Sequence, residues 1–168
     1  FDHCGGFTKY NDGGVSELIF KNADIYVQKI HHAAAVSPTE RDRASFIKEN
    51  TEPILNSPRL KAIDGNIELF EGISVRVFNG HTPGMQAIWI ESEGASGCYL
   101  SDLAPTSSHV PIPYIMGYDL QPLVIIDEKK RTFDEMAAKG TYAIFEHDPD
   151  MFVAKIQKGD KGFSYQRA

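Results

Sequence analysis

The stretch Gly80-His81-Thr82-Pro83-Gly84 joins two segments in which apolar and polar residues alternate. Residues 73–78 precede it and residues 85–91 (MQAIWIE) follow it. An alternation with a period of two is typical of strands that bury one face. The two glycines allow a sharp turn, and Pro83 stiffens the backbone. The stretch therefore predicts two strands joined by a short loop that presents His81 at a strand end.

Further elements are expected on both sides of this pair. Strand-like alternation extends from residue 60 to residue 78, and the other predicted strands are 23–28, 97–100, 141–146 and a closing hairpin of 153–157 and 162–165. Helices are expected at 37–50 and at 120–139, where Gly140 is a natural stop. The apolar face expected for the second helix consists of Leu123, Ile126, Phe133, Met136 and Ala137. This mixture predicts the α/β class, with layers packed around a sheet.

Composition narrows the class of protein. The 168 residues have the length of one ordinary domain. The net charge of −6 disfavours binding to a nucleic-acid backbone. No run of about 18 apolar residues is present, so no membrane span is expected. Two cysteines cannot build a disulfide framework, which favours a reducing compartment, and we expect a cytoplasmic protein.

Four candidate positions with metal-binding side chains lie at the ends of predicted strands or in the loops after them. They are Asp2-His3, His81, Asp102 and His147. Strand ends are places where a rigid sheet can direct side chains into one site. Imidazoles mixed with carboxylates suit zinc or a similar divalent ion.

The local context of these residues resembles the metallo-β-lactamase superfamily. Asp2-His3-Cys4-Gly5-Gly6 resembles the end of its His-x-His-x-Asp-His signature, and Gly80-His81-Thr82-Pro83-Gly84 resembles its Gly-His-Thr-Pro-Gly loop. Leu100-Ser101-Asp102 resembles the strand end that gives the bridging aspartate, and Phe145-Glu146-His147-Asp148 the strand end that gives the last histidine. The four matches occur in the superfamily's order and cover nearly the whole chain.

The resemblance implies a fold and a set of ligands. The fold is part of an αββα sandwich whose N-terminal strands are absent from this chain, so residues 1–168 are expected to be a single, N-terminally incomplete domain. Two divalent ions, most simply zinc, are implied in the complete protein, and one or none in the fragment. His81 would bind the first ion with two upstream histidines, Asp2, His3 and His147 would bind the second, and Asp102 would bridge them. Asp2 and Asp102 are also the implied catalytic residues, and no organic cofactor is expected.

The implied function is that of a metallohydrolase. A metal-activated hydroxide would attack a small carbonyl substrate such as a lactone or an ester. His109, Tyr114 and Tyr118 are pocket-lining candidates on the proline-rich segment after Asp102. Lactonases of this superfamily often carry a tyrosine three residues after the bridging aspartate, where this chain has Pro105.

Two alternatives stay open at the level of sequence. One is a thioesterase similar to glyoxalase II, although those enzymes commonly have histidine where this chain has Met85. The other is a non-catalytic fragment that needs a partner to complete the fold, either a second copy in a homodimer or a companion N-terminal fragment. In either enzyme reading the partner is a small-molecule substrate, without nucleic acid or membrane.

Overall fold

The chain divides between Asp64 and Gly65 into two units. The computed structural model describes residues 3–168. The expectation of a single domain over residues 1–168 stays a prediction. Each unit has its own sheet pairing and its own buried cluster.

The first unit is built from short elements around a small apolar cluster. Its elements are η1 Gly5–Phe7, β1 Thr8–Tyr10, β2 Ser16–Leu18, β3 Ile25–Gln28, α1 Lys29–Val36, η2 Arg43–Ser45, α2 Lys48–Leu55 and β4 Leu60–Ile63. β1 and β2 pair antiparallel, and β3 and β4 pair parallel. Cys4, Ile25 and Ile54 are the buried residues of the cluster. This unit therefore has little core of its own.

The helix expected at 37–50 is wrong. The structure has α1 before this stretch and α2 at its end and beyond, with a 3-10 turn between them. Thr39 donates through its backbone N–H and its hydroxyl to Asp42 Oδ1, at 2.8 and 2.6 Å. These bonds close a local turn, because side chains of this kind compete with helical hydrogen bonding. The polar residues that suggested a helix cap thus form a turn instead.

The second unit carries the large sheet. Its elements are β5 Ile67–Phe70, β6 Ile73–Phe78, β7 Met85–Ser92, β8 Ala95–Tyr99, η3 Ser101–Leu103, η4 Ser107–His109, α3 Pro122–Lys139, β9 Tyr142–Ile144, β10 Val153–Gly159 and β11 Gly162–Arg167. The strand order is β11-β10-β9-β8-β7-β6-β5. Within this sheet only β8 and β9 pair parallel, and their connection contains α3. The strands predicted from alternation are confirmed here, as is the α/β class.

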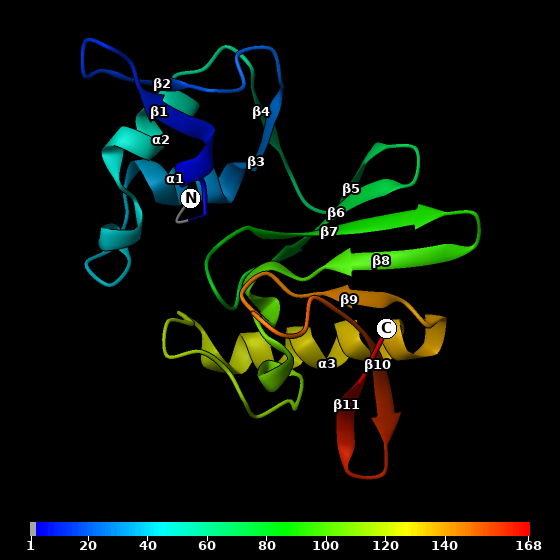
Figure 1. The fold of residues 1–168 in the computed structure, drawn as a ribbon. Coiled ribbons are helices and arrows are strands. Elements are labelled where there is room, and N and C mark those ends of the chain that lie inside the picture. The colour runs from blue at the N-terminus through cyan, green and yellow to red at the C-terminus, as the bar shows by residue number, and fades with distance from the viewer. Residues whose placement is uncertain (1–2) are drawn as a thin grey trace. The chain divides into compact units, whose positions relative to one another are not determined.

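Helix α3 lies along one face of this sheet (Figure 1). It ends at Gly140, which adopts a φ of 67° in the left-handed region. Phe133 and Met136 pack into the main core with Trp89 of β7. Leu123, expected on the apolar face, is exposed instead, and Ile125 is buried. The buried face is therefore rotated from the expected one.

An ion pair ties α3 to the sheet. Arg76 of β6 donates twice to Glu135 of α3, with Nη2 3.0 Å from Oε1. The Arg76 guanidinium also lies 3.7 Å from the centroid of the Trp89 ring. Arginine stabilises a folded structure most when its planar guanidinium stacks on an aromatic ring and pairs with both oxygens of a carboxylate. This pair fixes the helix over the strands that lead to His81.

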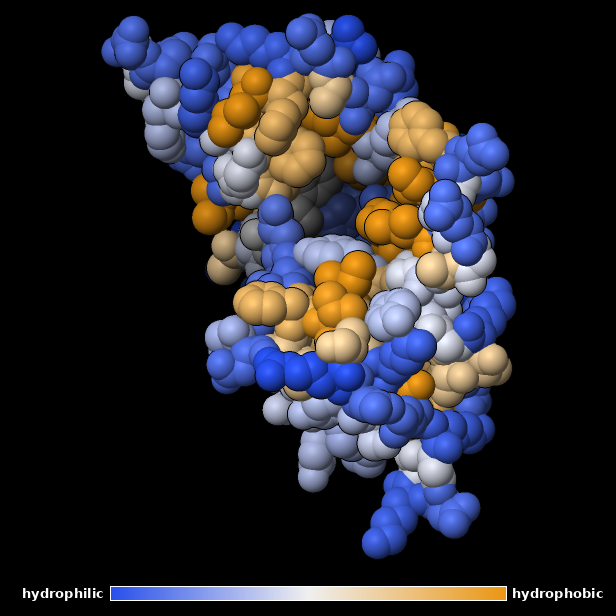
Figure 2. Space-filling view, turned by 45° about the vertical axis from the view of Figure 1, so that its right-hand side comes forward, coloured by the Kyte–Doolittle hydropathy of each residue, from blue (hydrophilic) through white to orange (hydrophobic). Residues whose placement is uncertain are grey.

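Apolar side chains also reach the surface. Figure 2 shows such side chains among hydrophilic ones on one face of the molecule. In the second unit, Ile73 and Ile90 are cross-strand partners and remain partly exposed. Within residues 3–168, no helix has the length and apolar character needed to cross a bilayer.

Candidate functional site

Three strands of the second unit deliver three of the predicted ligands to one edge of the sheet. β6 is antiparallel to β7, β7 is antiparallel to β8, and β8 is parallel to β9, so β6, β8 and β9 run in one direction. His81 follows β6, Asp102 follows β8 and His147 follows β9. The carboxyl ends of strands that run together meet at the same edge of a sheet. Residues far apart in the sequence are brought together for this reason.

The two histidines face different oxygens of one carboxylate. His81 Nε2 lies 3.2 Å from Asp102 Oδ2, and His147 Nε2 lies 3.5 Å from Asp102 Oδ1. His81 and Asp102 are buried, whereas the His147 side chain is 49% exposed. Two imidazole nitrogens and both oxygens of one carboxylate thus converge.

A second carboxylate orients His81. Its Nδ1 lies 3.0 Å from Asp119 Oδ1, and the other oxygen of Asp119 accepts the backbone N–H of Met116 at 2.8 Å. Burial alone would lower the pKa of His81, but hydrogen bonds with Asp102 and Asp119 and their charges raise it to about 9. Two buried carboxylates therefore favour a positive charge at this imidazole. A carboxylate on the far nitrogen is also the usual partner of a metal-binding histidine.

The loop before His81 is held from α3. Glu128 accepts the backbone N–H groups of Asn79 and Gly80, at 2.7 and 3.0 Å. Desolvation raises the pKa of Glu128, and these two N–H bonds oppose the rise. A Cβ on Gly80 would lie 2.4 Å from the backbone nitrogen of Ile125. Only glycine lets the loop approach the helix this closely.

Asp102 lies directly beyond the end of the parallel strand pair. The backbone N–H of Leu100 donates to the carbonyl of Ile144 at 3.1 Å, so pairing continues to the last residue before the turn. Ser101 then adopts a φ of 52°, which is uncommon for a residue with a side chain. Such backbone strain often occurs at functional sites. The sharp turn directs Asp102 out of the sheet.

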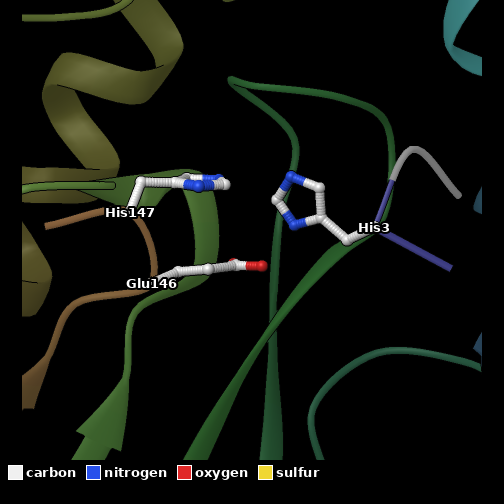
Figure 3. A group of neighbouring side chains, drawn as sticks. All are labelled: His3, Glu146 and His147. Atoms are coloured by element: carbon white, nitrogen blue, oxygen red, sulfur yellow. The ribbon is translucent and has the colours of Figure 1, made fainter. Parts of the chain in front are cut away.

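His147 and Glu146 occupy a bend after β9. Figure 3 shows the side chains of Glu146 and His147 extending to the same side of this segment. Glu146 shares a hydrogen bond with Tyr99 of β8, and burial together with this bond raises the pKa of Tyr99. The backbone N–H of His147 donates to the carbonyl of Pro105 at 3.0 Å. The position that carries tyrosine in many lactonases here supports His147.

The segment between Asp102 and α3 is fixed by a buried lysine. Lys129 of α3 donates through Nζ to the carbonyls of Pro111, Ile112 and Tyr114, at 3.2, 3.2 and 2.7 Å. Desolvation lowers the pKa of Lys129 to about 8. All three ammonium protons have acceptors, which makes burial of the charge tolerable.

The remaining predicted residues lie elsewhere. His3 belongs to the first unit, just before the buried Cys4, and Asp2 lies outside the described residues. His109 is partly buried and its Nδ1 lies 2.8 Å from Thr106 Oγ1. Tyr114 and Tyr118 are largely exposed. Their roles as ligand and pocket residues stay predictions.

Sequence reasoning missed the residues that support this site. They are Asp119, Glu128, Lys129 and Asp148, all of which are buried. Glu128 and Lys129 follow the buried Ile125 at helical spacing, and charged residues on a buried face are a signal of specific partners. No comparable sequence signal marks Asp119 or Asp148.

Comparison with known proteins finds hydrolases that are similar to this chain in sequence and in fold. No protein-family model matches the chain. An N-acyl homoserine lactonase of Bacillus thuringiensis is 29% identical over 151 residues, which are 88% of this chain and 52% of the relative. The chain thus spans about half the length of the curated relatives it matches.

Solved structures give the same assignment of fold. A probable metal-dependent hydrolase of Staphylococcus aureus is 25% identical with a TM-score of 0.84, over 100% of this chain and 59% of that one. AidC, a dizinc quorum-quenching lactonase, is 21% identical with a TM-score of 0.76, over 90% and 57% of the two chains. The hydrolase AbOPH of the β-lactamase superfamily is 19% identical with a TM-score of 0.80, over 99% and 60%. By fold and by sequence similarity, the chain resembles hydrolases of the metallo-β-lactamase superfamily.

Proposed function

We propose that the protein is a metal-dependent hydrolase that cleaves a small carbonyl compound, such as a lactone or another ester, at a site containing His81, Asp102 and His147. The observation that carries this proposal is the approach of both imidazoles to separate oxygens of Asp102, at 3.2 and 3.5 Å. A carboxylate in this position can bridge two cations. Imidazole nitrogen and carboxylate oxygen together suit zinc, so the donor set fits the proposed metal.

The residues of the chain would then have distinct tasks. Bound divalent ions lower the pKa of water towards neutrality and polarise carbonyl groups. Asp119 holds the His81 ring with Nε2 towards Asp102, and Asp102 offers one oxygen to each side of the site. By resemblance, Asp2 and His3 complete the ligand set around His147 in the whole protein, and Asp2 with Asp102 acts in catalysis.

The relatives favour lactones among carbonyl substrates, because the matching curated proteins are N-acyl homoserine lactonases. His109, Tyr114 and Tyr118 are the proposed substrate-facing residues of the segment that Lys129 anchors. We therefore place N-acyl homoserine lactones first among the substrates to be tried.

A substrate screen tests the proposal. The purified protein is assayed with zinc against N-acyl homoserine lactones, aryl esters, thioesters, β-lactams and phosphodiesters, before and after treatment with a chelator. We expect lactone or ester hydrolysis that is lost on chelation and restored by zinc. Activity confined to phosphodiesters, or activity that survives complete removal of metal, would overturn the proposal.

A variant pair ties the activity to the site. Asp102→Ala should reduce turnover at least about 100-fold, because it removes an oxygen partner from both histidines. The exposed Asp160, in the β10–β11 turn, gives a matched control with the same loss of charge. Zinc content and the thermal stability of the metal-free protein are measured for both. Unchanged turnover and zinc content in Asp102→Ala would contradict the assignment.

A further inference from the structure

Asp148 follows His147 directly, and its carboxylate accepts four hydrogen bonds. One oxygen accepts the backbone N–H and the hydroxyl of Ser107, at 2.8 and 2.6 Å. The other accepts the backbone N–H groups of Asp150 and Met151, at 3.0 and 2.8 Å. Asp148 and Ser107 are both buried. A carboxylate with this many donors is held in a single orientation.

These bonds join the two segments that carry proposed ligands. Ser107 begins η4, five residues after Asp102, while Asp150 and Met151 belong to the turn after His147. The bond from the backbone N–H of His147 to the carbonyl of Pro105 runs between the same segments. The backbone of His147 is therefore attached to the segment that follows Asp102 through its own N–H and through the next side chain.

His147 depends on this attachment more than His81 does. The His81 side chain is buried and bonded through Nδ1 to Asp119. The His147 side chain is 49% exposed, so packing restricts its ring far less. The placement of its backbone therefore contributes to its 3.5 Å approach to Asp102.

We propose that Asp148 is a positioning residue, which holds the metal ligand His147 at its distance from Asp102 by clamping Ser107 and the 150–151 turn. This inference rests on the metal role proposed above for His147. Residues that do not bind the metal themselves affect metal affinity through the ligands that they orient.

Zinc titration of the purified protein tests the inference. Asp148→Asn keeps the shape of the side chain but directs an amide NH2 group at one of the two donor pairs. We expect zinc affinity to fall about 10- to 100-fold, the usual effect of losing such a support. The matched control is Asp160→Asn, which removes the same charge from an exposed side chain in the β10–β11 turn, outside the clamp, and should leave zinc affinity within about twofold.

A double-variant cycle separates positioning from general stability. Ser107→Ala removes the hydroxyl bond alone and should weaken zinc binding less than Asp148→Asn does. Combined with Asp148→Asn it should add little further loss, because both act through one contact. Additive losses would overturn the inference. Should Asp148→Asn fail to fold, unchanged zinc affinity in Ser107→Ala would overturn it as well.

His147→Ala distinguishes the two proposals. Loss of tight zinc binding in His147→Ala, with unchanged binding in Asp148→Asn, would overturn the positioning role and leave the metal site standing. Zinc binding that does not depend on His147, or no zinc binding by the unaltered protein, would overturn both.

Discussion

Replacement of Gly80 by alanine should disturb both the stability of the protein and the placement of His81. The added Cβ would lie 2.4 Å from the backbone nitrogen of Ile125 and 2.5 Å from its Cα. A normal contact needs about 3.4 Å, so the loop or α3 must move by about 1 Å in a packed interior. The movement also lengthens the bonds of 2.7 and 3.0 Å from Asn79 and Gly80 to Glu128.

The expected cost follows from these contacts. Overpacking of this kind costs about 1–3 kcal/mol, and two loosened hydrogen bonds to a carboxylate add about 1 kcal/mol. We therefore expect the free energy of unfolding to fall by about 2–4 kcal/mol. Since His81 is the next residue, zinc affinity should fall about tenfold as well.

Urea denaturation and zinc titration measure the two effects. Gly159→Ala is the control, because nothing lies within 4 Å of a Cβ at Gly159 and no positive φ is involved there. It should change stability by no more than about 0.5 kcal/mol. If Gly80→Ala matched this control in stability and zinc affinity, the close approach of the loop to α3 would not support the site.

Three further changes test the supports of the sheet and the site. Asp119→Asn should weaken zinc binding about 10- to 100-fold. It should also lower the pKa of His81 from about 9, as measured by NMR titration of the metal-free protein. An unchanged pKa of His81 would contradict the contact between His81 and Asp119. The pKa of Glu135 is lowered to about 2 from 4.5, first by its hydrogen bond with Arg76, so its stabilisation is complete above pH 4.5 and is lost as the pH falls towards 2. Glu135→Gln should therefore lose about 1 kcal/mol less stability than the unaltered protein between pH 7 and pH 3, a figure already reduced for solvent screening. Urea titrations at the two pH values measure this difference. An equal loss in the variant and the unaltered protein would exclude the ion pair. Lys129→Met should cost about 1–3 kcal/mol in thermal unfolding, since three carbonyls lose a donor; an unchanged melting temperature would show that the ammonium group is dispensable.

Much of the fold of the second unit could be read from local patterns. Alternation predicts β6 and β7 because a strand places successive side chains on opposite faces. Gly140 predicts the end of α3 because only glycine adopts its left-handed conformation readily. In the first unit the same reasoning failed at 37–50, where Thr39 and Asp42 bond to each other.

The sequence by itself determined which residues could bind metal, because imidazole and carboxylate groups at expected strand ends can be identified from the order of the residues. His81, Asp102 and His147 were predicted in this way. Only the tertiary structure decided that they meet, because that depends on β6, β8 and β9 running in one direction, and strand direction is a property of pairing between distant segments.

The supports of the site also depend on tertiary structure alone. Glu128 and Lys129 are charged, and a helical pattern counts such residues as solvent-facing. In the folded chain they are buried, because one accepts the N–H groups before His81 and the other donates to the carbonyls of the segment after Asp102. A charged group enters an interior only when its partners are already there. Those partners come from distant loops, so a local pattern can indicate that Glu128 and Lys129 need partners but does not identify them.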